Sequence, residues 1–108
     1  MNAGSLFDLL KPDHFTHVII DEAAQITEPE CLIPIGLAPH SKVVLAGDPM
    51  QLGAVVKSTL AKNLNLDVSL MERLMGNKMY TRNVDLYGDQ GGYNPQLVTK
   101  LTNNYRYF

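Results

Sequence analysis

The stretch that decides the fold is residues 15–25, Phe-Thr-His-Val-Ile-Ile-Asp-Glu-Ala-Ala-Gln. An apolar run from Phe15 to Ile20, rich in β-branched side chains, stops at two adjacent carboxylates, Asp21 and Glu22. Because the run has no alternating polar side, it predicts a strand that is covered on both faces, as in a parallel sheet. Ligands of such sheets bind beyond the carboxyl ends of the strands. We therefore expect Asp21 and Glu22 to lie at a binding edge.

The two carboxylates suit the chemistry of a nucleotide phosphate. Asp21 is able to hold a hydrated Mg²⁺ on the phosphate, because this hard cation prefers oxygen ligands. Glu22 is able to polarise an attacking water. The plain alternative is a strand that runs into an acidic loop, which is the commoner outcome for an Asp-Glu pair after an apolar run. The other segments of the chain decide between these two interpretations.

A helix is predicted between this strand and the next. Thr27 and Glu30 match a capping box, in which the two residues cap the helix start reciprocally. Pro29 falls in the first turn, where its missing N–H costs little. The helix continues with mostly apolar residues to Leu37, and Pro34 is expected to kink or shorten it.

Residues 42–46, Lys-Val-Val-Leu-Ala, predict a second buried strand. Strand, helix and strand then form a βαβ unit of a parallel sheet. The second strand ends in a tight turn fixed by Gly47 and Pro49, which aims Asp48 and Gln51 at the edge where the first strand ends. A lone Gly-Asp-Pro is usually a structural turn. The pairing of two polar strand ends is what indicates a single phosphate site.

The second half of the chain is predicted to contain two short helices and a loop. Ser58–Asn63 fits one helix, and Ser69 with Glu72 forms a second capping box before a helix that Gly76 ends. Residues 77–95 are polar and contain several glycines, which predicts a long loop and a candidate domain boundary.

The last segment resumes an extended apolar pattern from Leu97 to Thr102 and then turns polar. Tyr105 offers a ring face for a base, and Arg106 offers a planar donor fork for a phosphate. Alone, this Tyr-Arg pair is weak evidence, and its plain interpretation is a surface pair.

Length and composition exclude several classes of protein. With 108 residues the chain is one small domain or part of a larger one, and its net charge of −2 gives no broad electrostatic footprint for nucleic acid. The single cysteine, Cys31, leaves no disulfide partner and no multi-cysteine metal cluster. His14 and His17 are expected to be structural, because further metal ligands are lacking. Without a secretory signal pattern or a membrane-length apolar run, we expect a cytoplasmic protein.

Three ordered motifs resemble those of a known family. Residues 21–25 (DEAAQ), 47–52 (GDPMQL) and 104–106 (NYR) look like motifs II, III and IV of superfamily 1 helicases. Within that superfamily the chain is most similar to the Armitage / Moloney-leukaemia-virus-10 branch of RNA helicases, which is related to the nonsense-mediated-decay helicase. The segments that carry this narrower likeness are TEPECLIPIGL (27–37), LAGDPMQL (45–52), SLMERL (69–74) and NPQLVTKLTNNYR (94–106).

The resemblance implies a site for ATP and Mg²⁺ with residues from both strand ends. Asp21 would bind the metal ion, Glu22 would activate the hydrolytic water, and Gln51 would sense the γ-phosphate. Tyr105 would stack on the adenine, and Arg106 would act as an arginine finger from a second RecA-like lobe. The implied catalytic residues are thus Glu22, Gln51 and Arg106, and the implied cofactor-binding residues are Asp21, Gln25, Gly47, Asp48 and Tyr105.

The fold class implied is α/β: a partial RecA-like P-loop NTPase fold, with a parallel sheet and flanking helices, incomplete at both ends. Residues 1–76 would be the C-terminal part of the first RecA-like lobe, 77–95 a polar loop or linker, and 96–108 the first strand of the second lobe. No Gly-x-x-x-x-Gly-Lys-[Ser/Thr] motif occurs in the sequence, so the phosphate-cradling loop and its lysine are missing. We expect a truncation at each end and a marginally stable fold.

Three functional interpretations are weighed. The first is a fragment of an ATP-dependent RNA helicase, enzymatic in its full-length form but not as this chain alone, with RNA and small-RNA silencing proteins as partners of the parent in cytoplasmic or ribonucleoprotein-granule surroundings. The alternative is a non-enzymatic binding module that docks on the parent helicase or on RNA-silencing partners. A metal-dependent phosphohydrolase using Asp21, Glu22 and Asp48 is the third, and it requires further carboxylates or histidines around the metal.

Overall fold

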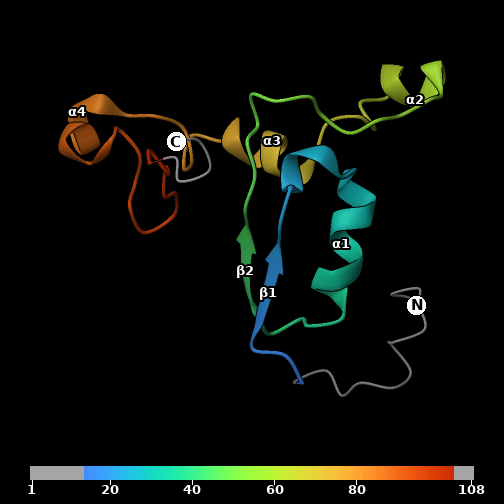
Figure 1. Cartoon of the computed structure of the whole chain (residues 1–108), viewed down its shortest axis with the longest axis horizontal. Coiled ribbons are helices and arrows are strands. Elements are labelled where there is room, and N and C mark those ends of the chain that lie inside the picture. Colours follow the sequence, from blue (N-terminus) through green and yellow to red (C-terminus); the bar gives the residue numbers. More distant parts are fainter. Residues whose placement is uncertain (1–13, 104–108) are drawn as a thin grey trace. The chain divides into compact units, whose positions relative to one another are not determined.

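The computed structural model describes residues 14–103 of the chain (Figure 1). The expected roles of Tyr105 and Arg106 therefore fall outside the described residues. The elements of the described part, in chain order, are β1 (His17–Ile20), the 3₁₀-helix η2 (Ala23–Gln25), α1 (Glu28–Gly36), β2 (Lys42–Leu45), α2 (Thr59–Asn63), α3 (Leu70–Met75), α4 (Val84–Tyr87) and the 3₁₀-helix η3 (Gly88–Gln90).

The chain divides into two compact units, residues 1–73 and residues 74–108. The first unit contains β1, β2, α1 and α2, the second contains α4 and η3, and α3 spans the boundary. This boundary lies close to the end of the first predicted segment, residues 1–76. The assignment of that segment and of residues 96–108 to two RecA-like lobes stays a prediction.

In the described residues, β1 and β2 form a parallel two-stranded sheet, with His17 opposite Lys42 and Ile20 opposite Leu45. Both strand arrows point the same way in Figure 1, and α1, which connects the strands, contacts β1. The predicted α/β class, with a parallel sheet and flanking helices, is therefore confirmed. Parallel pairing brings the carboxyl ends of the two strands to the same edge of the sheet.

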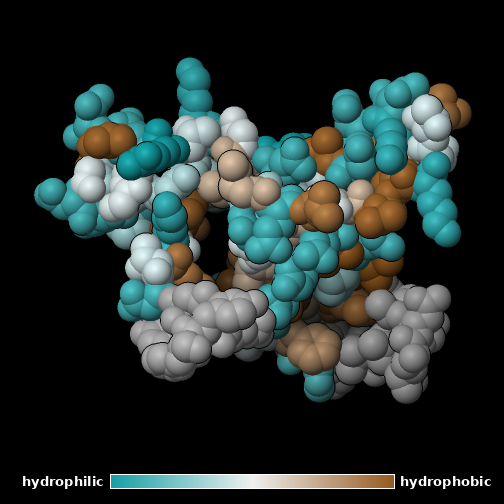
Figure 2. Space-filling view, turned by 45° about the horizontal axis from the view of Figure 1, so that its top comes forward, coloured by the Kyte–Doolittle hydropathy of each residue, from teal (hydrophilic) through white to brown (hydrophobic). Residues whose placement is uncertain are grey.

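The prediction that the first strand is covered on both faces is wrong for the described residues. Ile20 is buried, whereas Ile19 is 72% exposed and its register partner Val44 is 47% exposed. Successive side chains of a strand point to opposite faces, so Ile19 and Val44 share one face. The prediction that the second strand is buried is also wrong: no residue of β2 is buried, and Val43, on the same face as Ile20, is 42% exposed. A parallel sheet is buried on both sides only where helices cover both. We call Ile19 and Val44 the open sheet face. Figure 2 shows, for the molecule in general, that hydrophobic side chains, in brown, reach the surface among hydrophilic ones.

The start of α1 forms for the predicted reason. The Glu30 carboxylate reaches back to Thr27 and accepts from its backbone N–H at 3.2 Å and from its hydroxyl at 2.7 Å. Pro29 lies in the first turn, as predicted. Pro34 lies inside the helix and does not end it, since α1 continues to Gly36.

The two helices predicted in the second half of the chain, α2 and α3, begin after the predicted serines. The Ser58 hydroxyl accepts from the Ala61 N–H at 3.3 Å, and the Ser69 hydroxyl accepts from the Glu72 N–H at 3.1 Å. None of the helices in residues 14–103 combines the length and apolar character that crossing a membrane requires. The core is built mainly from small side chains; the buried apolar residues of the described part are Ile20, Ala23, Ala24, Cys31, Ala38, Ala54 and Leu70.

Residues 77–95, predicted as a polar loop or linker, contain the short helices α4 and η3. The segment is closed by two backbone hydrogen bonds, from the Asn83 N–H to the Gly92 carbonyl oxygen at 2.6 Å and from the Gly92 N–H to the Tyr87 carbonyl oxygen at 2.8 Å. Gly92 has a left-handed φ of 84°, which glycine adopts without a steric penalty. The segment is thus a folded loop rather than an extended linker.

The strand predicted within residues 96–108 is not observed in its described part. Residues 98–103 have no regular structure, and the chain turns at Asn94, whose carbonyl oxygen accepts from the Val98 N–H at 2.9 Å. A strand needs a neighbouring strand to pair its backbone groups, and the described residues of the second unit offer none. Residues 104–108 of the predicted strand lie outside the described part.

Candidate functional site

The carboxyl ends of β1 and β2 lie side by side. Beyond the strands the Ala46 N–H donates to the Ile20 carbonyl oxygen, and the Ala23 N–H donates to the Ala46 carbonyl oxygen, each at 2.8 Å. One loop leaves each strand at this edge: residues 21–25, the first loop, and residues 47–51, the second loop. The parallel register therefore brings the two polar strand ends next to each other.

Gly47 is a point of close approach between the two loops. A Cβ atom at this position would lie 3.1 Å from the Ala23 nitrogen and 3.2 Å from the Ala24 nitrogen. The third close neighbour is the Met71 sulfur of α3, at 3.3 Å. Because such distances are shorter than ordinary van der Waals contacts, only glycine fits here without a shift of the backbone or of Met71.

The first loop holds its polar groups by local hydrogen bonds. Asp21 Oδ1 accepts from the Glu22 N–H at 2.9 Å, and Glu22 Oε2 accepts from the Gln25 side-chain amide at 3.3 Å. The Glu22 backbone is left-handed, with φ 52° and ψ 35°, a conformation that costs a non-glycine residue roughly 1–2 kcal/mol. Ala23 and Ala24 are 0% and 3% exposed. The loop therefore presents three exposed polar side chains on a base of buried alanines.

The second loop repeats the pattern of an acid followed by a glutamine. Asp48 Oδ2 accepts from the Gln51 side-chain amide at 3.1 Å, and Asp48 Oδ1 accepts from the Met50 N–H at 2.9 Å. Both carboxylate oxygens of Asp48 thus shape the loop and hold Gln51 in place.

The two glutamines face a common groove. Gln25 and Gln51 both line an open groove of about 1070 Å³ beside the two loops, together with Glu30 of α1. Apolar residues within and after the second loop are exposed along the same groove. These are Met50, Leu52 and Val55.

In the part of the chain that the structure describes, no group of three His, Cys, Asp or Glu side chains is placed to hold a metal ion. His17 Nδ1 is hydrogen-bonded to the Thr16 hydroxyl at 2.9 Å, and the His14 ring meets the Phe15 ring edge-on, with 4.7 Å between centroids. The metal-dependent phosphohydrolase interpretation, which requires such a group around Asp21, receives no support from these residues.

Cys31 lies in the core of the first unit. Burial raises the pKa of its thiol, and the nearby Glu28 charge adds to this effect. A thiol with a raised pKa stays neutral and is a poor nucleophile. Cys31 is therefore a packing residue.

Sequence reasoning missed the support that α3 gives to the loops. The apolar residues of α3 indicate that this helix packs against the core, but the local pattern does not say which of them meets the strand ends. Met71 does so through Gly47. Neither loop contains a sequence signal for this contact, because it depends on how distant segments pack.

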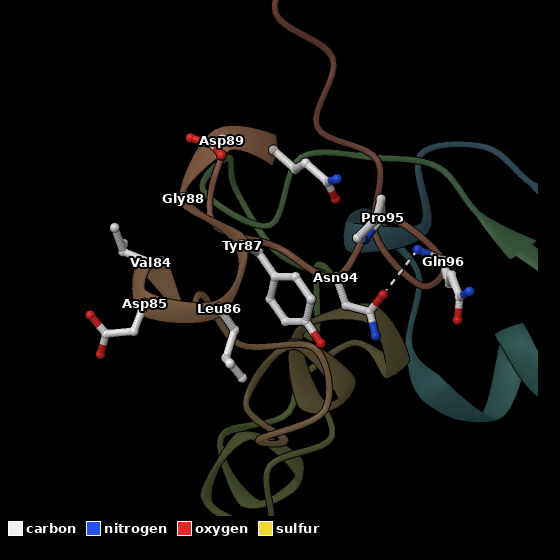
Figure 3. Close-up of a pocket in the computed structure, with 10 residues that line it drawn as sticks. Val84, Asp85, Leu86, Tyr87, Gly88, Asp89, Asn94, Pro95 and Gln96 are labelled. Atoms are coloured by element: carbon white, nitrogen blue, oxygen red, sulfur yellow. Dashed lines mark hydrogen bonds between the residues drawn. The ribbon is translucent and has the colours of Figure 1, made fainter.

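The second unit carries a separate pocket of about 580 Å³, lined by α4, η3 and the turn at Asn94 (Figure 3). In the close-up the Tyr87 ring faces Asn94, whose Oδ1 accepts from the Gln96 N–H at 3.0 Å. Asp85 and Asp89 point away from that side. The pocket contains none of the predicted catalytic or cofactor-binding residues.

A family model described as an AAA domain matches residues 2–59, just over half of the chain. The chain belongs to this family. Curated relatives narrow the assignment to RNA helicases. RNA helicase Mov10l1 of Mus musculus is 52% identical over 108 residues, covering 97% of this chain and 9% of the relative. RNA helicase Mov10l1 of Homo sapiens is 57% identical over 95 residues, covering 86% of this chain and 8% of the relative.

The Drosophila melanogaster protein named Probable RNA helicase armi is 44% identical over 95 residues, covering 86% of this chain and 8% of the relative. The predicted membership of the Armitage / Moloney-leukaemia-virus-10 branch of RNA helicases is therefore confirmed. The chain spans about a tenth of the length of these relatives. The AAA domain match includes both loops. No solved structure matches the chain.

Proposed function

We propose that this chain is a segment of an ATP-dependent RNA helicase and that its two loops form the metal and water side of the ATP site. The relatives described above are named as RNA helicases, and the AAA domain match covers both loops. In this proposal residues 1–76 are the C-terminal part of the first RecA-like lobe. The full-length protein couples ATP hydrolysis to movement along RNA or to unwinding.

One observation carries the proposal: two parallel strands end side by side in loops of the same design. In each loop a carboxylate accepts from the side-chain amide of the glutamine three residues later, Glu22 from Gln25 and Asp48 from Gln51. Open α/β sheets bind ligands at the carboxyl edge of their strands. Carboxylate and amide groups gathered at this edge suit a nucleotide phosphate and its metal ion.

The donor set fits Mg²⁺ that is bound together with ATP. In phosphate sites Mg²⁺ keeps several waters and takes one or two carboxylates plus phosphate oxygens, so a cage of three acids is not needed. Asp21 is exposed and, among the described residues, engages only Oδ1 in a hydrogen bond. Asp21 would hold the ion, which when bound neutralises charge on the phosphate.

Glu22 is suited to orient and deprotonate the attacking water. Its carboxylate is exposed and is steadied by the Gln25 amide at one oxygen. The left-handed backbone of Glu22 is strained, and such strain clusters at active sites, where the surrounding structure maintains it. Gln51, which lines the same groove as Gln25, would sense the terminal phosphate.

This chain alone is expected to bind ATP weakly. Its 108 residues contain no Gly-x-x-x-x-Gly-Lys-[Ser/Thr] sequence, and the backbone N–H groups and lysine of that motif cradle the phosphates. The proposal therefore assigns hydrolysis to the full-length protein, in the cytoplasm, with Tyr105 and Arg106 as the adenine stack and arginine finger of its second lobe.

The test is ATP hydrolysis by the full-length protein carrying Glu22→Gln. We expect the rate to fall by about 10²–10⁴-fold, the usual range for loss of a general base, while ATP binding measured by calorimetry persists. Asp21→Asn should instead weaken binding of Mg·ATP. Glu72→Gln removes an exposed carboxylate from α3 and should change neither quantity. A Glu22→Gln protein that hydrolyses ATP at the wild-type rate would overturn the proposal.

Calorimetric titration of the 108-residue chain with Mg·ATP tests whether ATP binding depends on the missing phosphate loop. We expect no detectable heat of Mg·ATP binding in the millimolar range. Clear stoichiometric binding would mean that the two loops hold nucleotide without a phosphate loop, contrary to the argument above.

The open sheet face favours a second candidate function, a non-enzymatic binding module. Ile19 and Val44 are exposed apolar residues on a two-stranded sheet, and such a surface invites association. The module would dock on the parent helicase or on RNA-silencing partners. Sedimentation of the chain, alone and with the parent helicase, distinguishes the two functions. A discrete oligomer or a stoichiometric complex with the parent helicase favours the binding module, whereas aggregation favours a fragment without a function of its own.

A further inference from the structure

The two loops are supported by α3 at two points. The Met71 sulfur lies 3.3 Å from the position of a Cβ on Gly47, at the start of the second loop. Two residues later, Arg73 forms a forked ion pair with Glu28, the first residue of α1. Its Nε donates to Oε2 and its Nη2 donates to Oε1, each at 2.7 Å. α3 thus joins the start of the second loop to the helix that follows the first loop.

The Glu28–Arg73 pair restrains the orientation of α3 relative to α1 as well as the distance between the two helices. Its partners lie 45 residues apart in the sequence, so it links separate elements rather than neighbouring turns of one helix. A planar guanidinium that meets both carboxylate oxygens restrains orientation in a way that a single hydrogen bond does not. The hydrogen bond from Arg73 holds the pKa of Glu28 below its ordinary value, and the same contact raises the pKa of Arg73.

The surroundings of the pair show what it restrains. Glu30, not Glu28, reaches back to cap α1, which leaves the Glu28 carboxylate available to α3. At the other end, α3 starts from Ser69, which is fully buried, and from Leu70, which is also buried. The start of α3 is therefore anchored by burial, and Arg73, one turn later, sets the direction of the helix from that anchor.

We propose that Arg73 is a positioning residue for the two-loop site, orienting α3 through its forked pair with Glu28 so that Met71 packs against Gly47. The inference rests on the proposed function for its catalytic consequence. Arg73 touches no reacting atom and acts through the helix that carries it. Without the fork, α3 turns about its buried start, Met71 withdraws from Gly47, and the second loop loses its fixed place beside the first.

The first arm of the test follows the Met71–Gly47 contact by NMR on the chain with ¹³C-methyl-labelled methionine. We expect a nuclear Overhauser effect between the Met71 methyl group and the Gly47 α-protons, and its loss in Arg73→Gln. Arg73→Lys keeps the charge without the fork and should restore the signal only in part. Glu72→Gln, on the same helix, should retain it. Full retention of the signal in Arg73→Gln overturns the inference.

The second arm uses ATP hydrolysis by the full-length protein and does not require the isolated chain to fold. Arg73→Gln and Glu28→Gln should each lower kcat by about 10- to 100-fold, because small misplacements of catalytic groups have effects of this size. KM for ATP and Tm should change little, since an exposed pair adds little to stability. The double variant should fall no further than either single variant. Additive losses, or an effect on KM alone, contradict the inference.

The two arms separate failure of the inference from failure of the proposed function. If the wild-type full-length protein does not hydrolyse ATP, the proposed function fails, and the NMR contact alone then decides whether Arg73 positions Met71. If Arg73→Gln hydrolyses ATP at the full rate, the inference fails and the proposed function stands.

Discussion

The first and second loops share a hydrogen-bond plan and differ in what supports them. In both, the glutamine backbone N–H donates to the carbonyl oxygen of the acid three residues before, at 2.9 Å in the first loop and 3.1 Å in the second. The middle of the first loop is Ala23 and Ala24, both buried, whereas Met50, in the middle of the second, is 91% exposed. Local sequence is enough to produce the same hydrogen-bond pattern in both loops. Packing against the rest of the chain decides that the middle of the first loop is buried and that of the second is exposed.

The largest expected effect comes from enlarging a buried side chain of the first loop. Ala24→Leu adds volume where the residue is 3% exposed, and overpacking of this kind destabilises by about 1–3 kcal/mol. Met50→Leu, at the exposed position of the second loop, should change the free energy of unfolding by less than about 0.5 kcal/mol. Urea denaturation followed by circular dichroism measures both. Equal effects would mean that the two loops are supported alike.

The next effect tests the approach of the two loops at Gly47. Gly47→Ala places a Cβ at 3.1–3.3 Å from its neighbours and should destabilise by about 1 kcal/mol as those neighbours shift. Gly53→Ala is the matched control, because its Cβ would lie at an ordinary 3.6 Å from the Asp67 carbonyl oxygen. That change should be neutral or stabilising by about 0.4–1 kcal/mol. If the two variants unfold at the same urea concentration, the close approach at Gly47 has no energetic importance.

The features that depend on near neighbours in the sequence were predictable. The capping contact from Glu30 to Thr27 and the ends of both strands follow from residue type and spacing. The side-by-side placement of Asp21 and Asp48 at one sheet edge follows from parallel pairing.

The features that depend on distant segments were not predictable from the local sequence. An apolar run predicts burial on both faces, yet the exposure of Ile19 depends on how many elements cover the sheet. Arg73 forms an ion pair with Glu28, 45 residues away in the sequence, and no local sequence pattern predicts such a pair. For the same reason the pattern at 97–102 predicted a strand that residues 98–103 do not form, since pairing needs a neighbour.

A smaller effect distinguishes the strained backbone of the first loop from an ordinary left-handed turn. Glu22→Gly relieves the left-handed φ of 52° and should stabilise the fold by about 0.5 kcal/mol, the relief less the extra entropy of glycine in the unfolded chain. Asn65→Gly, at a φ of 60°, should gain less, because asparagine adopts this conformation more readily. Thermal melts of the two variants measure the difference, and a larger gain at Asn65 would show that Glu22 is not strained.

The smallest expected effect is a loss of stability in acid that arises from Glu28, the first residue of the helix after the first loop. The hydrogen bond from Arg73 holds the pKa of Glu28 below the ordinary 4.5 of the unfolded chain. Between these two values only the unfolded chain binds the proton. This contribution to stability is therefore fully present above pH 4.5 and is lost as the pH falls through the folded-state pKa. The loss is small, because solvent screens the pair.

Urea midpoints measured between neutral pH and pH 3 test this sign. Glu28→Gln should flatten part of the acid limb of the stability curve, because its side chain takes up no proton, while Glu72→Gln should retain the wild-type curve. Arg73→Gln should flatten the same part of the limb as Glu28→Gln, because either change removes the contact that lowers the pKa. An acid limb in Arg73→Gln that matches the wild type would mean that the forked pair does not form in solution, and α3 would then lose its second attachment beside the loops.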